Sequence, residues 1–384
     1  MTAAKNGTAL LYSLLAQAQQ FPDTIVLGRG DVDLETPTHI VAAAREAMSR
    51  NGTEPTPPEG ILALRKAIAE RVRRINEIDV DPEHEIVVTN GGQEALFLMV
   101  QTAIGPGDEL LVPEPNYNTY IDALRFAQGN KRAVPTYAAE NFRVVPDRVR
   151  QAITAKTRAL LLASPNNPSA SVINPADARE LVAIAQEHDL IILADDIYDM
   201  FLYDDIVHQS PASLPGGKER TLTLNALSKS FAMTGWRLGW IVGPADLMAQ
   251  VKKLKAAVSG STSIISQYAA IAALEGPQDV VDEMREIYLR RRRVVTDALD
   301  EMDIPYGTPQ GGQFLFADIS SLGLSCIDIA QRILSEQRVL VYPGIAFGPE
   351  LDQYLRITFL QPEELLREGM ARMKQTMSAI LAAR

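Results

Sequence analysis

The order of apolar and polar positions divides the chain into two regions. Between Glu85 and Val242, short apolar runs alternate with segments whose apolar residues recur at helical spacing. The expected strands are 85–89, 109–112, 131–137, 159–163, 190–194, 221–225 and 238–242, and helical patterns such as 175–188 separate most of them. Short apolar strands separated by helices predict an α/β fold, with a mainly parallel seven-stranded sheet covered by helices.

Outside this region helical patterns dominate. The expected helices are 8–20, 36–50, 61–76, 277–301, 326–337 and 362–382, and strand-like pieces fall at 314–317 and 354–359. This mixture predicts a smaller α+β region, completed by the N-terminal segment. We therefore expect residues 1–48 to join the small domain, residues 49–282 to form the large domain and residues 283–384 to form the small C-terminal domain.

Composition narrows the classes of partner. The chain has 384 residues, of which 46% are hydrophobic, as in a globular protein. A formal net charge of -11 disfavours nucleic acid and anionic membranes as partners. The single cysteine, Cys326, cannot form an internal disulfide and fits a reducing, cytoplasmic compartment. No signal peptide, membrane span or metal-ligand spacing is expected from the sequence.

Lys229 is the first candidate for chemistry. It lies among small and hydroxyl residues, and Arg237 follows eight positions later. A partly desolvated lysine near a second cation loses its proton more easily and can attack a carbonyl carbon. An arginine fork suits a phosphate, and a carbonyl compound that carries a phosphate describes pyridoxal 5′-phosphate. Taken alone, a Ser-Lys-Ser sequence is more often a solvated loop.

Glycines suggest a second anion site. Gly91 and Gly92 follow an expected strand and open a helix, which forms either a phosphate cradle or a tight turn that binds nothing. The sequence Gly28-Arg29-Gly30 has Asp33 where the dinucleotide fingerprint needs its third glycine, so a nicotinamide dehydrogenase is disfavoured. There is no Walker A sequence either.

Other polar residues follow expected strands or interrupt them. Asp195 could hold a pyridinium nitrogen protonated or cap a helix, and Tyr117 could stack on a flat ring or fill a gap. Asn167 lies in a Pro/Asn turn. Arg356, in an apolar strand, needs either a substrate carboxylate or a structural acid. Most of these residues fall at the carboxyl ends of strands, where an open α/β sheet binds ligands.

Several motifs, taken in order, resemble a known family. They are Ser-Lys-Ser-Phe-Ala-Met-Thr-Gly-Trp-Arg-Leu-Gly-Trp at 228–240, Ala-Asp-Asp-Ile-Tyr at 194–198, Ser-Pro-Asn-Asn-Pro at 164–168, Pro-Gly-Ile-Ala-Phe-Gly at 343–348 and Leu-Arg-Ile-Thr at 355–358. From about residue 24 onward the chain resembles the fold-type I, class I aminotransferases that depend on pyridoxal 5′-phosphate (PLP), most of all their prokaryotic aspartate/aromatic branch.

The resemblance implies the cofactor PLP and a set of residues that hold it. Lys229 would form the Schiff base and move the proton, and Asp195 would pair with the ring nitrogen. The remaining implied cofactor contacts are Tyr117 on the ring face, Asn167 and Tyr198 at the phenolic oxygen, and Arg237, Ser228 and the backbone of Gly92, Gln93 and Glu94 at the phosphate. For the substrate, the resemblance implies that Arg356 binds the α-carboxylate with help from Asn167 and the Gly30 backbone.

The sequence also departs from the family pattern. The usual tyrosine that reaches the neighbouring subunit's phosphate is replaced by Pro55, and a frequent phosphate hydroxyl is replaced by Ala226. The usual Asn-Pro-Thr-Gly ends in Ser169-Ala170, and the usual Gly-Ala-Phe becomes 311–313, Gly-Gly-Gln. As a hypothesis, Arg29 binds a distal carboxylate of the substrate; the alternative is an ion pair of Arg29 with Asp31 or Asp33.

The implied activity is transfer of an amino group from an α-amino acid to a 2-oxo acid, by a ping-pong mechanism through aldimine and ketimine intermediates. A PLP-dependent β- or γ-lyase or a cyclising enzyme on the same scaffold is the alternative. A PLP-sensing transcription regulator would need a basic helix-turn-helix, which the acidic sequence does not predict. A binding protein without catalysis is disfavoured by the intact Lys229. The resemblance also implies a homodimer with each site at the subunit interface.

Overall fold

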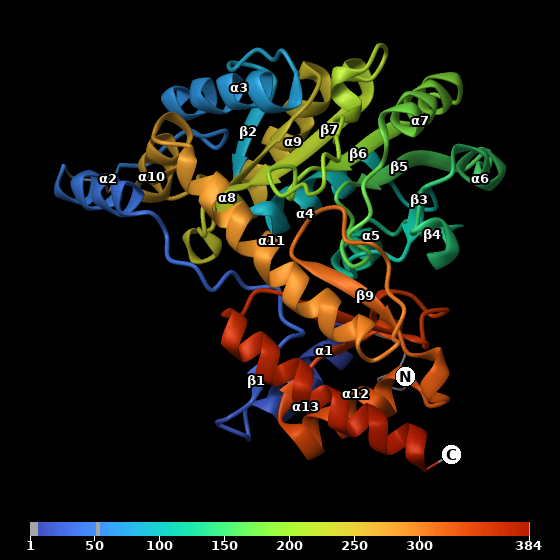
Figure 1. The fold of residues 1–384 in the computed structure, drawn as a ribbon. Coiled ribbons are helices and arrows are strands. Elements are labelled where there is room, and N and C mark those ends of the chain that lie inside the picture. Colours follow the sequence, from blue (N-terminus) through green and yellow to red (C-terminus); the bar gives the residue numbers. More distant parts are fainter. Residues whose placement is uncertain (1–6, 51–53, 384) are drawn as a thin grey trace.

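The computed structural model describes residues 7–50 and 54–383. Its centre is a seven-stranded sheet of strand order β2-β8-β7-β6-β5-β3-β4 (Figure 1). The strands are β2 (Ile86–Thr89), β3 (Glu109–Glu114), β4 (Asn130–Pro135), β5 (Thr157–Ala163), β6 (Ile191–Asp195), β7 (Thr221–Ala226) and β8 (Gly239–Val242). Of these seven strands, β8 alone runs opposite to the others, so the predicted mainly parallel sheet is confirmed.

Helices cover both faces of this sheet because alternate strand residues are apolar on each face. Leu161 and Leu193 pack in a core with α4 (Gly92–Ala103), α5 (Thr119–Phe126) and α9 (Ala245–Val258). Their neighbours Leu160 and Ile192 pack on the opposite side with α6 (Pro146–Ala152) and α7 (Pro175–Glu187). This two-sided burial explains why the strands appear in the sequence as continuous apolar runs.

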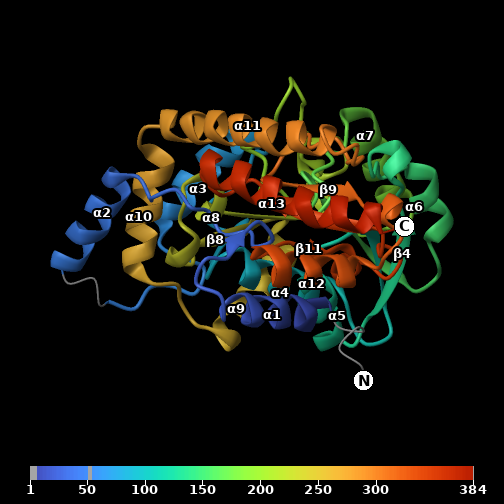
Figure 2. The same cartoon turned by 60° about the horizontal axis from the view of Figure 1, so that its bottom comes forward.

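The smaller region combines both ends of the chain (Figures 1 and 2). Strands β9 (Phe314–Asp318), β11 (Tyr342–Pro343) and β12 (Tyr354–Thr358) form an antiparallel sheet, which α12 (Cys326–Gln337) and α13 (Glu363–Ala382) accompany. From the N-terminal side, α1 (Gly7–Ala18) and β1 (Ile25–Val26) lie beside these helices, and β1 pairs parallel with β10 (Val339–Leu340). The N-terminal segment therefore packs with the C-terminal region.

Four further helices complete the fold (Figure 1): α2 (Thr38–Ser49) and α3 (Leu62–Asn76) pack against α10 (Ile264–Glu275) beside β2 of the large sheet, and α11 (Asp279–Asp300) runs from there to α13 of the smaller region. Both expected domain boundaries fall inside helices: 48/49 lies in α2 and 282/283 lies in α11. These boundaries therefore stay predictions. Within residues 7–50 and 54–383, no helix is long and apolar enough to cross a membrane, and no group of three acidic, histidine or cysteine side chains could hold a metal ion.

Candidate active site

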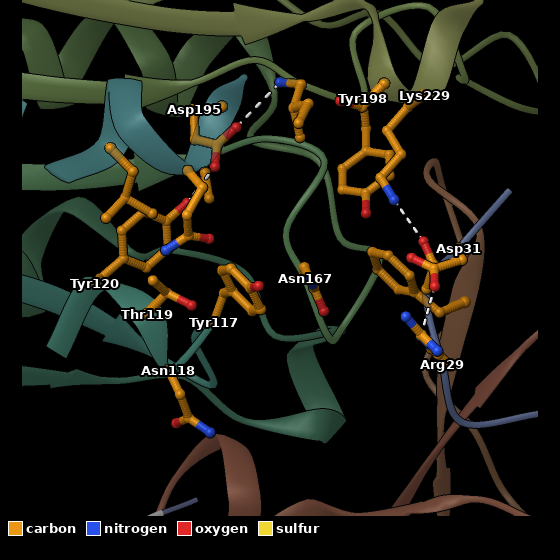
Figure 3. A pocket seen from close by; sticks show the side chains of 18 of the residues that line it. Arg29, Asp31, Tyr117, Asn118, Thr119, Tyr120, Asn167, Asp195, Tyr198 and Lys229 are labelled. Atoms are coloured by element: carbon orange, nitrogen blue, oxygen red, sulfur yellow. Dashed lines mark hydrogen bonds and ion pairs between the residues drawn. The ribbon is translucent and has the colours of Figure 1, made fainter. Parts of the chain in front are cut away.

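A cavity of about 700 Å³ lies at the carboxyl ends of the parallel strands, between the sheet and the smaller region. In the view of Figure 3, Tyr117, Tyr120 and Asp195 lie on one side of it and Lys229, Arg29 and Asp31 on the other, with Asn167 between them. The residues selected from the sequence that line it are Arg29, Gly30, Gly92, Gln93, Tyr117, Asn167, Asp195, Tyr198, Ser228, Lys229, Arg237 and Arg356. Apart from Glu94, every selected site residue therefore reaches one cavity.

Lys229 enters the cavity from the short helix α8 (Leu227–Ser230), which directly follows β7. Its Nζ donates a hydrogen bond to the carbonyl oxygen of Gly30. The loss of water around the amine lowers the pKa of Lys229 to about 8, against the opposing charge of Asp31. A lysine with this pKa has a much larger neutral, nucleophilic fraction at neutral pH than an exposed lysine.

Asp195 is the last residue of β6, and its carboxylate is held at both oxygens. Oδ1 accepts a hydrogen bond from the Ile197 N–H (3.1 Å), and Oδ2 accepts one from the hydroxyl of Tyr120. Burial raises the pKa of Asp195 to about 6, although the hydrogen bond from Tyr120 lowers it. A carboxylate that is costly to keep ionised in isolation is stabilised when a cation binds beside it.

Tyr120 is a site residue that the sequence interpretation missed. It is the second residue of α5 and follows the loop residue Tyr117 by three positions, and the two rings meet edge to face with centroids 6.1 Å apart. Its ring is buried in the core against α4, so the sequence pattern shows only a core aromatic. The usable signal was the three-residue spacing of the two tyrosines: the turn that leads into α5, closed by the bond from the Tyr120 N–H to the Tyr117 carbonyl (3.2 Å), brings both rings to the cavity.

Arg356 is a buried cation with no acid beside it in the described part of the chain. It is 4% exposed in β12, its Nη1 donates to Asn167 Oδ1 (2.9 Å) and its Nη2 donates to the Gly28 carbonyl. Nε has no hydrogen-bond partner among the described residues, and no described acidic side chain forms an ion pair with the guanidinium. Burial lowers the pKa of Arg356. The sequence left two possible partners for Arg356, a substrate carboxylate or an acidic residue of the protein. Within residues 7–50 and 54–383, no such acidic residue is found.

A second anion-binding arrangement lies at the start of α4. Gly91 has φ +84°, and no side chain caps the first turn of the helix. The guanidinium of Arg237 lies against this turn, since a Cβ added to Gly91 would come within 2.8 Å of Nη2. Arg237 donates to the carbonyls of Thr234 and Asn90, and no described acid pairs with it. Free helix N–H groups beside an unpaired guanidinium suit a phosphate.

Four residues that the sequence singled out contribute no free side chain to the cavity: Glu94, Arg29, Pro55 and Ala226. The Glu94 carboxylate pairs with Lys255 and does not line the cavity. Arg29 and Asp31 line it as a half-exposed ion pair, which is the alternative arrangement for Arg29. Pro55 is exposed, and Ala226 is fully buried.

The change from the usual phenylalanine to Gln313 has a visible consequence. Gln313 is fully buried, and its amide oxygen and nitrogen have no partner among the described residues. The amide does not line the cavity, whereas the next residue, Phe314, does. A buried amide without partners costs stability, so this departure does not add a group to the site.

Comparisons with known proteins agree with this geometry. Residues 22–373 match the model of the family "Aminotransferase class I and II". The chain is 39% identical to an aspartate aminotransferase of Pyrococcus abyssi over 92% of each chain. It is 40% identical to an arginine–pyruvate transaminase of Pseudomonas aeruginosa, over 94% of this chain and 92% of that protein. The structure of an aromatic aminotransferase from Pyrococcus horikoshii superposes with a TM-score of 0.91 at 38% identity, covering 95% and 99% of the two chains.

A lysine, an aspartate and two anion sites around one cavity, on a mainly parallel sheet, define an enzyme of the amino-group-transferring class. The chain belongs to the aminotransferase class I and II family. The family, fold type I and aminotransferase activity expected from the motifs are thereby confirmed. The relatives act on aspartate, arginine and aromatic amino acids by their names, so family membership alone does not fix the side chain of the substrate.

Proposed function

We propose that this cavity binds PLP together with an α-amino acid, and that the chain moves the amino group to a 2-oxo acid. One observation carries the proposal: the same cavity contains Lys229, of lowered pKa, and two separate guanidinium groups, Arg237 and Arg356, with which no described acid forms an ion pair. Two anion sites near one lysine suit two ligands, one with a phosphate and one with a carboxylate.

The residues present fit PLP. The phosphate would lie at the first turn of α4 with Arg237 and Ser228, and the ring nitrogen at Asp195. Tyr117 would cover the ring face, and Tyr198 with Asn167 would donate to the phenolic oxygen. Bound there, PLP supplies an electron sink for the charge left when the substrate loses its α-proton. The hydroxyls missing at Pro55 and Ala226 leave the phosphate to the helix N–H groups, Arg237 and Ser228.

The protein's own groups would then perform three tasks. Arg356 orients the amino acid by its α-carboxylate, with Asn167 fixed beside it at 2.9 Å. The neutral Nζ of Lys229 accepts the α-proton and returns it, because its lowered pKa makes it a base near neutral pH. Asp195 stays ionised beside a cation and holds the proton on the ring nitrogen, and Tyr120 fixes the orientation of its carboxylate.

A panel of amino donors tests the proposal. The purified protein is loaded with PLP, mixed with single amino acids, and followed by absorbance and then by transfer to pyruvate, 2-oxoglutarate or oxaloacetate. We expect a change of the bound cofactor with the donor alone and formation of a new amino acid after the acceptor is added. Release of ammonia and pyruvate without an acceptor would instead identify a β-lyase on the same scaffold.

The pKa of Lys229 makes the covalent attachment of PLP depend on pH. Only the neutral amine attacks the carbonyl, so the attachment rate should rise about tenfold per pH unit well below the pKa. The rise should level off above about 8, the pKa of Lys229 in the cavity, rather than near the ordinary value of 10.5. Stopped-flow absorbance of the cofactor-free protein between about pH 6.5 and 10 measures it. Non-covalent PLP binding to Lys229→Ala is the control, and a rate still rising through pH 10 would contradict the assignment.

Arg29 offers a site for the substrate side chain, and we keep the hypothesis that it binds a distal carboxylate. To do so it must exchange its partner Asp31, which is half-exposed and can be re-solvated at little cost. We expect Arg29→Ala to lower kcat/KM for acidic donors about fivefold, since a partly exposed charge pair contributes about 1 kcal/mol. Kinetics with aspartate and with a neutral donor of similar size decide. An unchanged ratio of the two would mean that Arg29 only pairs with Asp31.

We also propose a homodimer in the cytoplasm, with a site at each subunit interface. Tyr12 in α1 lines the cavity, yet 69% of it is exposed in the single chain. A large aromatic side chain at the rim of a site is the kind of surface that a second subunit covers. Sedimentation equilibrium should give twice the mass of one chain, and a monomer that retains full activity would refute the shared site.

A further inference from the structure

A buried ion pair lies directly behind the proposed phosphate site, outside the cavity. Lys255 in α9 is 0% exposed, and its Nζ lies 2.9 Å from Oε2 of Glu94 and donates to Ser259 Oγ at 2.6 Å. A lysine is almost never fully buried unless it is paired. None of the three tasks assigned to the cavity residues uses this charge.

Glu94 connects the pair to the turn that receives the phosphate. It is the third residue of α4, and its Oε2 accepts a hydrogen bond from the Asn90 N–H (2.6 Å) while Oε1 accepts one from Asn90 Nδ2 (3.2 Å). Asn90 directly precedes Gly91 and Gly92, and its carbonyl faces Arg237. The Glu94 carboxylate therefore fixes the chain just before the helix N–H groups that face the cavity.

This arrangement carries an electrostatic cost. A carboxylate in the first turn of a helix is favourable for the helix, but it places a negative charge next to a site for a phosphate dianion. Burial alone would raise the pKa of Glu94, yet hydrogen bonds from Ser259 and Asn90 and the charge of Lys255 lower it. The carboxylate thus stays ionised, and Lys255 is the cation that balances it.

We propose that Lys255 is a positioning residue for the cofactor phosphate. By neutralising Glu94, it allows this carboxylate to hold Asn90 and the Gly91-Gly92 turn without repelling the phosphate. The inference rests on the proposed function, since it assumes that the start of α4 receives the phosphate of PLP. It also explains how the site can bind a phosphate although Pro55 and Ala226 provide no hydroxyl. The Glu94–Lys255 pair holds the Gly91-Gly92 turn, so its N–H groups keep their orientation toward the phosphate.

The comparison of PLP with pyridoxal, which has the same aldehyde but no phosphate, isolates this role. Both bind to Lys229 in the same way, so the ratio of their Kd values reports the phosphate alone. We expect Lys255→Met, in the full-length cofactor-free protein, to weaken PLP about tenfold or more, because an unpaired Glu94 charge then faces the phosphate. Pyridoxal should change by less than about twofold, because it carries no charge at that point.

The matched control is the double variant Lys255→Met/Glu94→Gln, which removes both charges and keeps an amide oxygen for the Asn90 N–H. It should restore most of the wild-type Kd ratio. Equal losses for PLP and pyridoxal in Lys255→Met, or no recovery in the double variant, would overturn the inference. If the wild-type protein itself does not prefer PLP to pyridoxal, the proposed function fails rather than the role of Lys255.

A second variant keeps the test valid if Lys255→Met does not fold. Glu94→Gln alone leaves the positive charge of Lys255 behind the turn, so the preference for PLP over pyridoxal should equal or exceed that of the wild type. A preference reduced about tenfold would show that the carboxylate itself is required at the phosphate site and would overturn the inference.

Discussion

Lys229→Ala should lower kcat/KM for transamination by about four orders of magnitude or more, because one side chain provides both the covalent attachment and the proton transfer. PLP should still bind, since the start of α4, Arg237 and Asp195 do not depend on the amine. The variant removes a partly buried amine that donates one hydrogen bond, to the Gly30 carbonyl, so folding should be little affected.

Three measurements separate chemistry from folding in this variant. Borohydride reduction followed by peptide mass spectrometry should find the cofactor on Lys229 in the wild type and on no lysine in Lys229→Ala. Added small amines should restore part of the turnover, because they can replace the missing base. Lys252→Ala is the matched control: this lysine lies in α9, pairs with Glu59 and does not line the cavity, so its activity should be unchanged. Turnover retained by Lys229→Ala would refute the assignment.

Much of the large domain could be predicted because its strands are buried on both faces. Such strands form apolar runs with abrupt ends, so the predicted and observed bounds of β5 and β7 differ by two residues at most. The two-residue strands β1, β10 and β11 could not be predicted, since each is too short to show a period. Their pairing depends on tertiary contacts, as between Ile25 and Val339.

The same reasoning separates the site residues that the sequence revealed from those that it did not. Asp195 stood out because a polar side chain directly after an apolar strand lies at the ligand-binding edge of a parallel sheet, and Lys229 because it lies among small and hydroxyl residues with Arg237 close behind it. Tyr120 and Lys255 stood within helices, where an aromatic residue reads as core and a lysine as surface. Only the structure shows that Tyr120 donates to Asp195 and that Lys255 is buried against Glu94.

Arg356→Gln should produce the second large loss, and it should act on the substrate rather than the cofactor. Removing one partner of a buried charge pair costs about 2–5 kcal/mol, so kcat/KM should fall roughly 30- to 5,000-fold. The affinity for PLP should stay unchanged, because Arg356 lies in β12 and donates to Asn167 and Gly28, whereas the phosphate site lies at α4. If the loss appears in KM alone, Arg356 contributes uniform binding; an equal loss in kcat means that it orients the reacting atoms.

No described acid pairs with Arg356, so the role of Arg356 can be tested by removing the carboxylate from the substrate. A donor amino acid and the amine that lacks its carboxylate should differ strongly in kcat/KM with the wild type and much less with Arg356→Gln. The variant should keep or raise its melting temperature, because the folded chain no longer buries a cation without an acid. A lower melting temperature together with undiminished discrimination would show that Arg356 serves the fold. Since its guanidinium is buried with Nε unpaired, we expect the carboxylate of the substrate to be the acid that completes it.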